Sequence, residues 1–250
     1  LHGARGLMRG GWLRYGRLYA HFLRFSFART TQFRLDFAFR VLMDLVWNAH
    51  YLGMFALFAF HAETLGGFDV HQLRVFTGTI FVLDALQMTF VANGLWELPF
   101  AVNRGDLDYH LTRPVSSLFM VSLRDIAVSS SMNLLIAVGI LVWALASYPH
   151  PLDAAAFAVY LALLPVALTI HWALHLMALS TSFWTQSTKG LRDVFWTSVD
   201  YAFRPVGVYP GWVRRILTTV IPVGVMVSFP CHVLFHGVDL GVVAHMVGVG

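Results

Sequence analysis

Two pairs of histidines have the spacing of side chains that could share a metal ion or a haem. His171 and His175 are four residues apart, as are His232 and His236, so the two members of each pair lie on one face of a helix. A metal site usually needs a third or fourth ligand and an orienting partner, and the chain has a single cysteine, Cys231. The pattern favours histidines that hydrogen-bond across packed helices, and we expect no metal site.

The sequence lacks the motifs that carry hydrolytic or phosphate chemistry. It contains no G-x-S-x-G, no H-E-x-x-H and no G-x-x-x-x-G-K-[ST] loop. We therefore expect no catalytic residues and no cofactor in this chain. If the protein depends on ATP, the hydrolysis takes place on another polypeptide.

The segment over residues 103–125 has a pattern suited to docking a soluble partner, because it is long and its charged side chains alternate with apolar ones. The charged residues are Arg104, Asp106, Asp108, Arg113, Arg124 and Asp125, and the apolar ones are Leu107, Tyr109, Leu111 and Leu118. Gly105 permits an unusual backbone turn, and Pro114 redirects the chain. The alternative is a solvated loop with incidental charges.

The composition places all these residues in a membrane protein. Of the 250 residues, 58% are hydrophobic and 12% are charged, and the mean hydropathy is +0.66. A soluble domain carries about 25% charged residues. We therefore predict an all-α integral membrane protein with little chain left for a soluble domain.

The hydrophobic runs predict how a single transmembrane domain over 1–250 is organised. It begins with an interfacial helix over 8–28, whose basic and aromatic side chains fall on opposite faces. Spans are expected over 37–60, 75–101, 126–147, 154–184 and 191–203, followed by two short outer-face helices over 211–236 and an incomplete sixth span over 238–250.

Polar side chains recur within the first two spans. Arg40, Asp44 and Asn48 follow one another every four residues, so they lie on one face of the first span. Because a charge in lipid costs about 2.5–3.5 kcal/mol, this face is expected to contact protein or water. The polar residues of the second span, which need partners inside the bundle, are Asp84, Gln87, Asn93 and Glu97.

The basic residues of the connecting segments predict the orientation. Twelve of them lie in the N-terminal arm, the 102–124 loop and the loop near residue 189, against four in the other connections. Basic residues favour the cytoplasmic side, so the N-terminus and the 103–125 loop are expected in the cytoplasm. Arg204, Arg214 and Arg215 depart from this rule. The arginines form no stripe along the chain, so we expect contact with membrane lipid and not with nucleic acid.

Three strings resemble the permease subunits of type-2 ABC exporters, and most closely an uncharacterised bacterial branch of that class. They are RGDLDYHLTRP at 104–114, SFWTQSTKGL at 182–191 and RPVGVYPGWVRRILTTVIPVGVMVSFPCHVL at 204–234. The resemblance covers nearly the whole chain in order. Cys231 stands where that branch usually has a small alanine.

The resemblance implies a non-catalytic subunit of an ATP-driven exporter in the bacterial inner membrane. It implies six spans, an interfacial elbow helix and a coupling helix that docks a separate ATPase subunit, where ATP and Mg²⁺ bind. It also implies a second permease, identical or related. The implied coupling residues are Arg104, Gly105, Asp106, Asp108, Leu111, Arg113 and Pro114, and the implied outer-gate residues are Tyr209, Pro210, Trp212, Pro222 and Pro230.

Two other functions remain open at this point. A membrane haem or quinone oxidoreductase subunit would use the histidine pairs. An ion-coupled secondary transporter would use Asp44, Asp84 and Glu97, but the internal repeats typical of that class are not found in the sequence.

Overall fold

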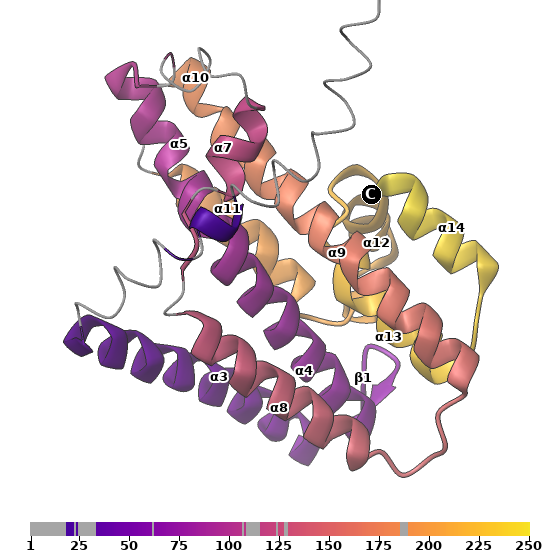
Figure 1. The fold of residues 1–250 in the computed structure, drawn as a ribbon. Coiled ribbons are helices and arrows are strands. Elements are labelled where there is room, and N and C mark those ends of the chain that lie inside the picture. The colour runs from indigo at the N-terminus through magenta and orange to yellow at the C-terminus, as the bar shows by residue number, and fades with distance from the viewer. Residues whose placement is uncertain are drawn as a thin grey trace, which may run out of the picture.

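The computed structural model describes residues 19–22, 24, 34–61, 63–106, 108, 116–123, 125–127, 130–185 and 190–250. These residues form packed helices and a short β-hairpin (Figure 1). Most of the interfacial helix predicted over 8–28 lies outside the described residues. The same holds for Leu111, Arg113 and Pro114 of the predicted coupling loop.

The elements before residue 150 are α3 (Arg34–His61), β1 (Thr64–Leu65), β2 (Phe68–Asp69), α4 (Val70–Gln87), the π-helical η1 (Met88–Ala92), α5 (Asn93–Arg104), α7 (Ser117–Leu123) and α8 (Ser131–Ala146). The elements after it are α9 (Ala154–Ser180), α10 (Ser182–Thr185), α11 (Leu191–Ala202), the 3-10 turn η3 (Val206–Val208), α12 (Gly211–Arg215), the π-helical η4 (Ile216–Val220), α13 (Val225–His236) and α14 (Leu240–Val249).

Three helical runs are long and apolar enough to cross a membrane. They are Phe37–Phe58, Val70–Arg104 and Ala154–Thr185. The runs Gly211–Val220 and Val225–His236 meet at 103° and can together form a fourth, broken span. Among the described residues, α8 and α14 are shorter apolar helices. The arrangement with six spans therefore stays a prediction.

The centre of the fold is α4, which continues through η1 into α5 as one run of 35 residues. Helices α3, α8, α9 and α13 all pack against α4 (Figure 1). Every residue from Val75 to Ala85 is buried, so this part of α4 has no solvent-facing side. In contrast, α3 leaves large apolar side chains exposed, among them Phe39, Met43 and Leu57.

Small and polar side chains let the helices approach α4 closely. A Cβ added at Gly78 would lie 2.9 Å from the Cα of Leu141, so α4 and α8 cross with their backbones nearly in contact. On another side, the hydroxyls of Thr79 and Tyr160 lie 2.8 Å apart and join α4 to α9. The thiol of Cys231 on α13 is 3.7 Å from the same Thr79 oxygen. One turn of α4 thus meets three helices.

The predicted polar stripe of the first span is partly turned toward protein. Asn48 is buried, and its amide nitrogen donates to Oδ1 of Asn133 on α8 at 2.9 Å. One turn further on, the Tyr51 hydroxyl donates to Asp200 of α11 at 3.3 Å. These bonds satisfy polar groups that would otherwise be costly within an apolar bundle.

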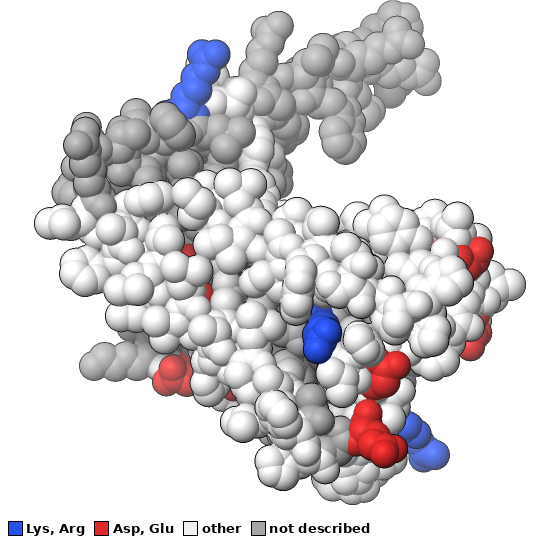
Figure 2. Space-filling view, turned by 90° about the horizontal axis from the view of Figure 1, so that it is seen from below, with Lys and Arg blue, Asp and Glu red and all other residues white. Residues whose placement is uncertain are grey.

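The few charged side chains lie mostly at the ends of the helices. Asp69, Asp153 and Asp239 cap the first turns of α4, α9 and α14 by accepting backbone N–H groups. In the view of Figure 2, most of the surface carries no charge and only a few acidic and basic side chains interrupt it. Such a surface is typical of a protein that contacts lipid.

The crossing at Gly78 gives a test of this packing. We expect Gly78→Ala to destabilise the purified protein by about 1–3 kcal/mol, because the added methyl group displaces the backbone of α8. The matched control is Gly139→Ala on α8, where an added Cβ meets no atom within 4 Å. That substitution should leave the stability unchanged or raise it. Thermal unfolding in detergent measures both, and equal midpoints would contradict the crossing.

Candidate functional site

The candidate site lies at one end of the molecule, where α5, α7 and α10 come together (Figure 1). The predicted docking segment over 103–125 begins at the end of α5 and contains α7. We call the charged end of α5 and the residues after it, Glu97, Arg104, Gly105, Asp106 and Asp108, the α5 tip.

The docking of α7 on α5 depends on a glycine. A Cβ at Gly94 would collide with the carbonyl oxygen of Val121 and lie 2.9 Å from that of Ser122. The Ser122 hydroxyl in turn accepts the indole N–H of Trp172 on α9 at 3.1 Å. The helix inside the docking segment is therefore held against two long helices.

A π-helical turn anchors the other end of the segment. Residues 88–92 form η1, between α4 and α5, and the Thr89 carbonyl accepts the backbone N–H of Ala127 at 2.9 Å. π-helical turns change the normal i to i−4 pairing and are frequent at functional sites. No motif in the sequence indicates this turn or its contact with Ala127.

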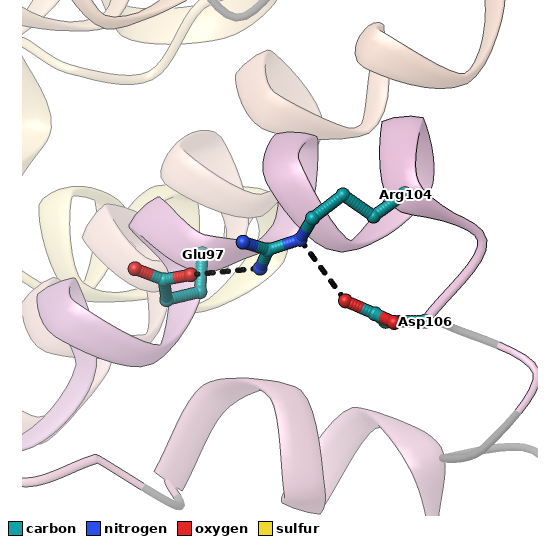
Figure 3. A network of polar contacts seen from close by, with 3 residues as sticks. All are labelled: Glu97, Arg104 and Asp106. Carbon is teal, nitrogen blue, oxygen red and sulfur yellow. Dashed lines mark ion pairs between the residues drawn. The ribbon is translucent and has the colours of Figure 1, made fainter.

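The charges of the α5 tip are arranged around one arginine (Figure 3). Arg104 Nε lies 3.0 Å from Asp106 Oδ2, and its Nη2 lies 3.6 Å from Glu97 Oε2. All three side chains are more than half exposed, and such surface pairs contribute only about 0–1 kcal/mol to stability. The pairs therefore orient the charges more than they stabilise the fold.

Glu97 lies differently from the prediction. The sequence places it in the second span, where a partner inside the bundle is expected, but the structure exposes it and pairs it with Arg104. Its spacing of seven residues from Arg104 puts both on one helical face. That spacing is the signal in the sequence that could have assigned Glu97 to the tip.

Gly105 ends α5 in the left-handed conformation, with φ of 75°. Its N–H donates to the Val102 carbonyl at 3.3 Å, and the N–H of Asp106 donates to Ala101 at 3.0 Å. This is the geometry of a glycine cap at a helix C-terminus. The cap turns the chain so that Asp106 comes back toward Arg104.

The structure brings together Arg104, Gly105 and Asp106, and Asp108 follows as an exposed residue. Leu111, Arg113 and Pro114 lie outside the described residues. The implied outer-gate residues are elsewhere, around α12 and α13 (Figure 1).

Around α12 and α13, the implied gate residues stand where the backbone changes direction. Pro210 precedes the first residue of α12, and Pro222 lies in the break before α13. Pro230 lies inside α13. The Tyr209 hydroxyl donates to the Tyr201 carbonyl at 3.2 Å, and Trp212 is exposed. Burial raises the pKa of Tyr209, so this phenol stays protonated as a donor.

The two histidine pairs occupy different surroundings. His171 and His175 are buried, and both imidazoles stack on the ring of Phe195, with centroids 5.7 and 3.9 Å apart. The amide nitrogen of Gln87 lies 3.0 Å from Nδ1 of His175. An aromatic side chain therefore fills the space beside this pair. Within the described part of the chain, no three His, Cys, Asp or Glu side chains group as metal ligands.

A comparison with known protein families gives a match that covers most of the chain. The family model described as ABC-2 family transporter protein matches residues 45–248. This range covers most of α3 and nearly all of the chain after it, including the α5 tip and the bent pair. No curated protein and no solved structure matches the chain.

The α5 tip and its support should respond differently to substitution. We expect Arg104→Ala to change the free energy of unfolding by less than about 1 kcal/mol, because its ion pairs are exposed. Gly94→Ala should cost about 1–3 kcal/mol, because it forces α7 away from α5. Thermal unfolding in detergent measures both. A large loss of stability in the Arg104 variant would mean that the tip is part of the packed core.

Proposed function

The chain belongs to the ABC-2 family of transporter proteins, and we propose that it is the permease subunit of an ATP-driven exporter that docks a separate ATPase through the α5 tip. In this proposal the helices form the substrate pathway. The chain itself is non-catalytic, and ATP and Mg²⁺ are bound by the ATPase.

The observation that carries the proposal is the continuity of the α5 tip with the buried centre of the fold. A helical run of 35 residues is about 50 Å long at 1.5 Å per residue. The hydrocarbon core of a bilayer is about 30 Å thick. One end of this run therefore extends beyond the lipid, and the charged end with Glu97 and Arg104 is the one suited to water. A displacement of the tip would be passed along the helix into α4.

The charges of the tip suit a protein contact. Among its described residues, the tip carries three carboxylates and one guanidinium, arranged by the Arg104 ion pairs. Charged groups at the rim of an interface give specificity and fix the register of the two partners. We propose that the ATPase presents complementary, mainly basic groups to Glu97, Asp106 and Asp108.

The remaining features of the assembly follow from the family and from the exposed surfaces. The apolar face of α3 would contact membrane lipid or the second permease, identical or related. The bent pair of α12 and α13 would form the outer gate. Because basic residues favour the cytoplasmic side, we place the N-terminus and the α5 tip in the cytoplasm of a bacterium and the protein in its inner membrane.

The docking role is tested by reversing charges at the tip. We expect Asp106→Lys with Asp108→Lys to reduce co-purification of the ATPase at least about tenfold, because like charges then face each other. ATP hydrolysis by the ATPase should no longer respond to the permease. Membrane insertion should stay normal, since both residues are exposed.

Two controls separate this result from a general effect of charge. Glu63→Lys reverses an exposed charge beside the hairpin, away from the tip, and Ser116→Ala alters an exposed residue near α7. Both variants should bind the ATPase normally. If the doubly reversed protein co-purifies and transports like the wild type, the 103–125 segment is only a connector.

The orientation is tested by labelling single cysteines in a Cys231→Ala background. A cysteine at Gly211, at the start of α12, should react with an impermeant thiol reagent added outside intact cells. A cysteine at Asp108 should react only after the membrane is opened. Labelling of the Asp108 position from outside would invert the proposed topology and place the α5 tip out of reach of a cytoplasmic ATPase.

A further inference from the structure

A pocket of about 500 Å³ lies between the β-hairpin, α12, η4, α13 and the start of α14. Its volume falls within the range of about 300–1,000 Å³ that is typical of small-molecule sites. It does not include any residue of the α5 tip. We propose that this pocket binds the phosphate group of an anionic amphiphile.

The charge of the lining is the first argument. Arg214, Arg215, His232 and His236 all line the pocket, and none of the described lining residues is acidic. The nearby Asp239 accepts the backbone N–H groups of Gly241 and Val242 as the cap of α14. Adjacent guanidinium groups can bind phosphate oxygens in a bidentate manner, so the pocket selects for an anion.

The hydrogen bond of His236 fixes the roles of its two ring nitrogens. His236 Nδ1 lies 3.2 Å from the His232 carbonyl, which can only accept, so Nδ1 carries the proton. The two imidazole rings stack with centroids 4.5 Å apart. In the neutral ring the Nε2 atom of His236 is then an acceptor, and it donates to a phosphate oxygen only when the ring is protonated. The Thr218 and Ser228 side chains add hydroxyl groups to the same lining.

Other residues of the lining are apolar. They are Phe68 of the hairpin, Val206, Phe229 of α13 and Val242 of α14. A free inorganic anion would make no use of the apolar surface that these side chains present to the pocket. A phosphate joined to an apolar group would contact both the basic and the apolar residues of the lining. The apolar group would be removed from water, and the phosphate would bind the arginines.

Close backbone contacts hold the walls of the pocket together. Gly66 has φ of 61°, and a Cβ added to it would lie 2.8 Å from the Cβ of Pro205. A Cβ at Gly207 would collide with the carbonyl of Gly66. The backbone N–H of Val206 donates to the Ser228 hydroxyl at 3.0 Å. The hairpin and η3 are thus held together by contacts that only glycine permits, and a hydrogen bond joins η3 to α13.

This inference goes beyond the proposed function, since it concerns a ligand at the bent pair and not the docking of an ATPase. It also gives a role to two arginines that the predicted membrane orientation does not explain. Arg214 and Arg215 depart from the basic-residue pattern of the rest of the chain, and a phosphate ligand gives these charges a partner. The test below uses no ATPase and no transport, so the two proposals can fail separately.

The experiment measures the thermal midpoint and the ligand affinity of the delipidated, purified full chain. The probes are inorganic phosphate, mixed micelles with phosphatidylglycerol, and mixed micelles with phosphatidylcholine. The test variant is Arg214→Gln with Arg215→Gln. The matched control is Arg74→Gln with Arg204→Gln, which removes two arginines outside the pocket.

We expect phosphatidylglycerol to raise the midpoint of the wild type and of the control, because a ligand that binds only the folded state stabilises it. Phosphatidylcholine should have a smaller effect. The affinity of the test variant for phosphatidylglycerol should fall at least about tenfold, since two charge-assisted contacts are lost. The pair Arg214→Lys with Arg215→Lys keeps the charge, and it should lose less affinity than the glutamine pair.

The outcomes separate the sources of the phosphate. Stabilisation by phosphatidylglycerol but not by inorganic phosphate identifies a lipid headgroup. Stabilisation by both supports the site with the phosphate alone as the recognised group. The proposal is overturned if the wild type responds equally to both lipids and not to phosphate, or if the test variant responds like the control. If the glutamine pair does not fold, the lysine pair and the single Arg214→Gln and Arg215→Gln variants decide in the same way.

Discussion

The burial of α4 is the constraint on which the rest of the structure depends. In lipid, a backbone can leave no N–H or C=O group unpaired, so the central element must be a helix. This helix can have no exposed side, because α3, α8, α9 and α13 all pack on it. Close packing is possible because Gly78 admits the backbone of α8. Two polar groups of α4 find partners on α9, since Thr79 lies in hydrogen-bond reach of Tyr160 and Gln87 of His175.

The α5 tip and the pocket at α13, for which we propose functions, are both connected to α4. The α5 tip is its direct continuation through η1, and α7 is held there at Gly94. On the other side, α13 carries the histidines of the pocket and contacts α4 through Cys231 and Thr79. The docking surface and the ligand site that we propose are therefore both in contact with one central helix. This arrangement suits a membrane subunit in which a cytoplasmic contact and an outer segment must respond to each other.

The two histidine pairs show why spacing alone does not assign a function. Both have four-residue spacing and both lie on helices. Around His171 and His175 the ring of Phe195 fills the neighbouring space, so these side chains serve packing. Around His232 and His236 the neighbours are Arg214, Arg215 and a cavity. The difference is made entirely by α11, α12 and the hairpin, which are distant in sequence from the histidines they cover.

The sequence by itself determined the class of the protein. Its low charge and long apolar runs indicate membrane helices, and its motifs resemble ABC-2 permeases, a family that the match over residues 45–248 confirms. It also located the charged segment after α5 and the proline breaks near 210 and 222, because backbone preferences are local. Only the tertiary structure decided that a π-helical turn binds Ala127, and that Arg214, Arg215, His232 and His236 line one cavity. These are contacts between elements, and the face that a helix turns to its neighbours is set by the packing of the whole bundle.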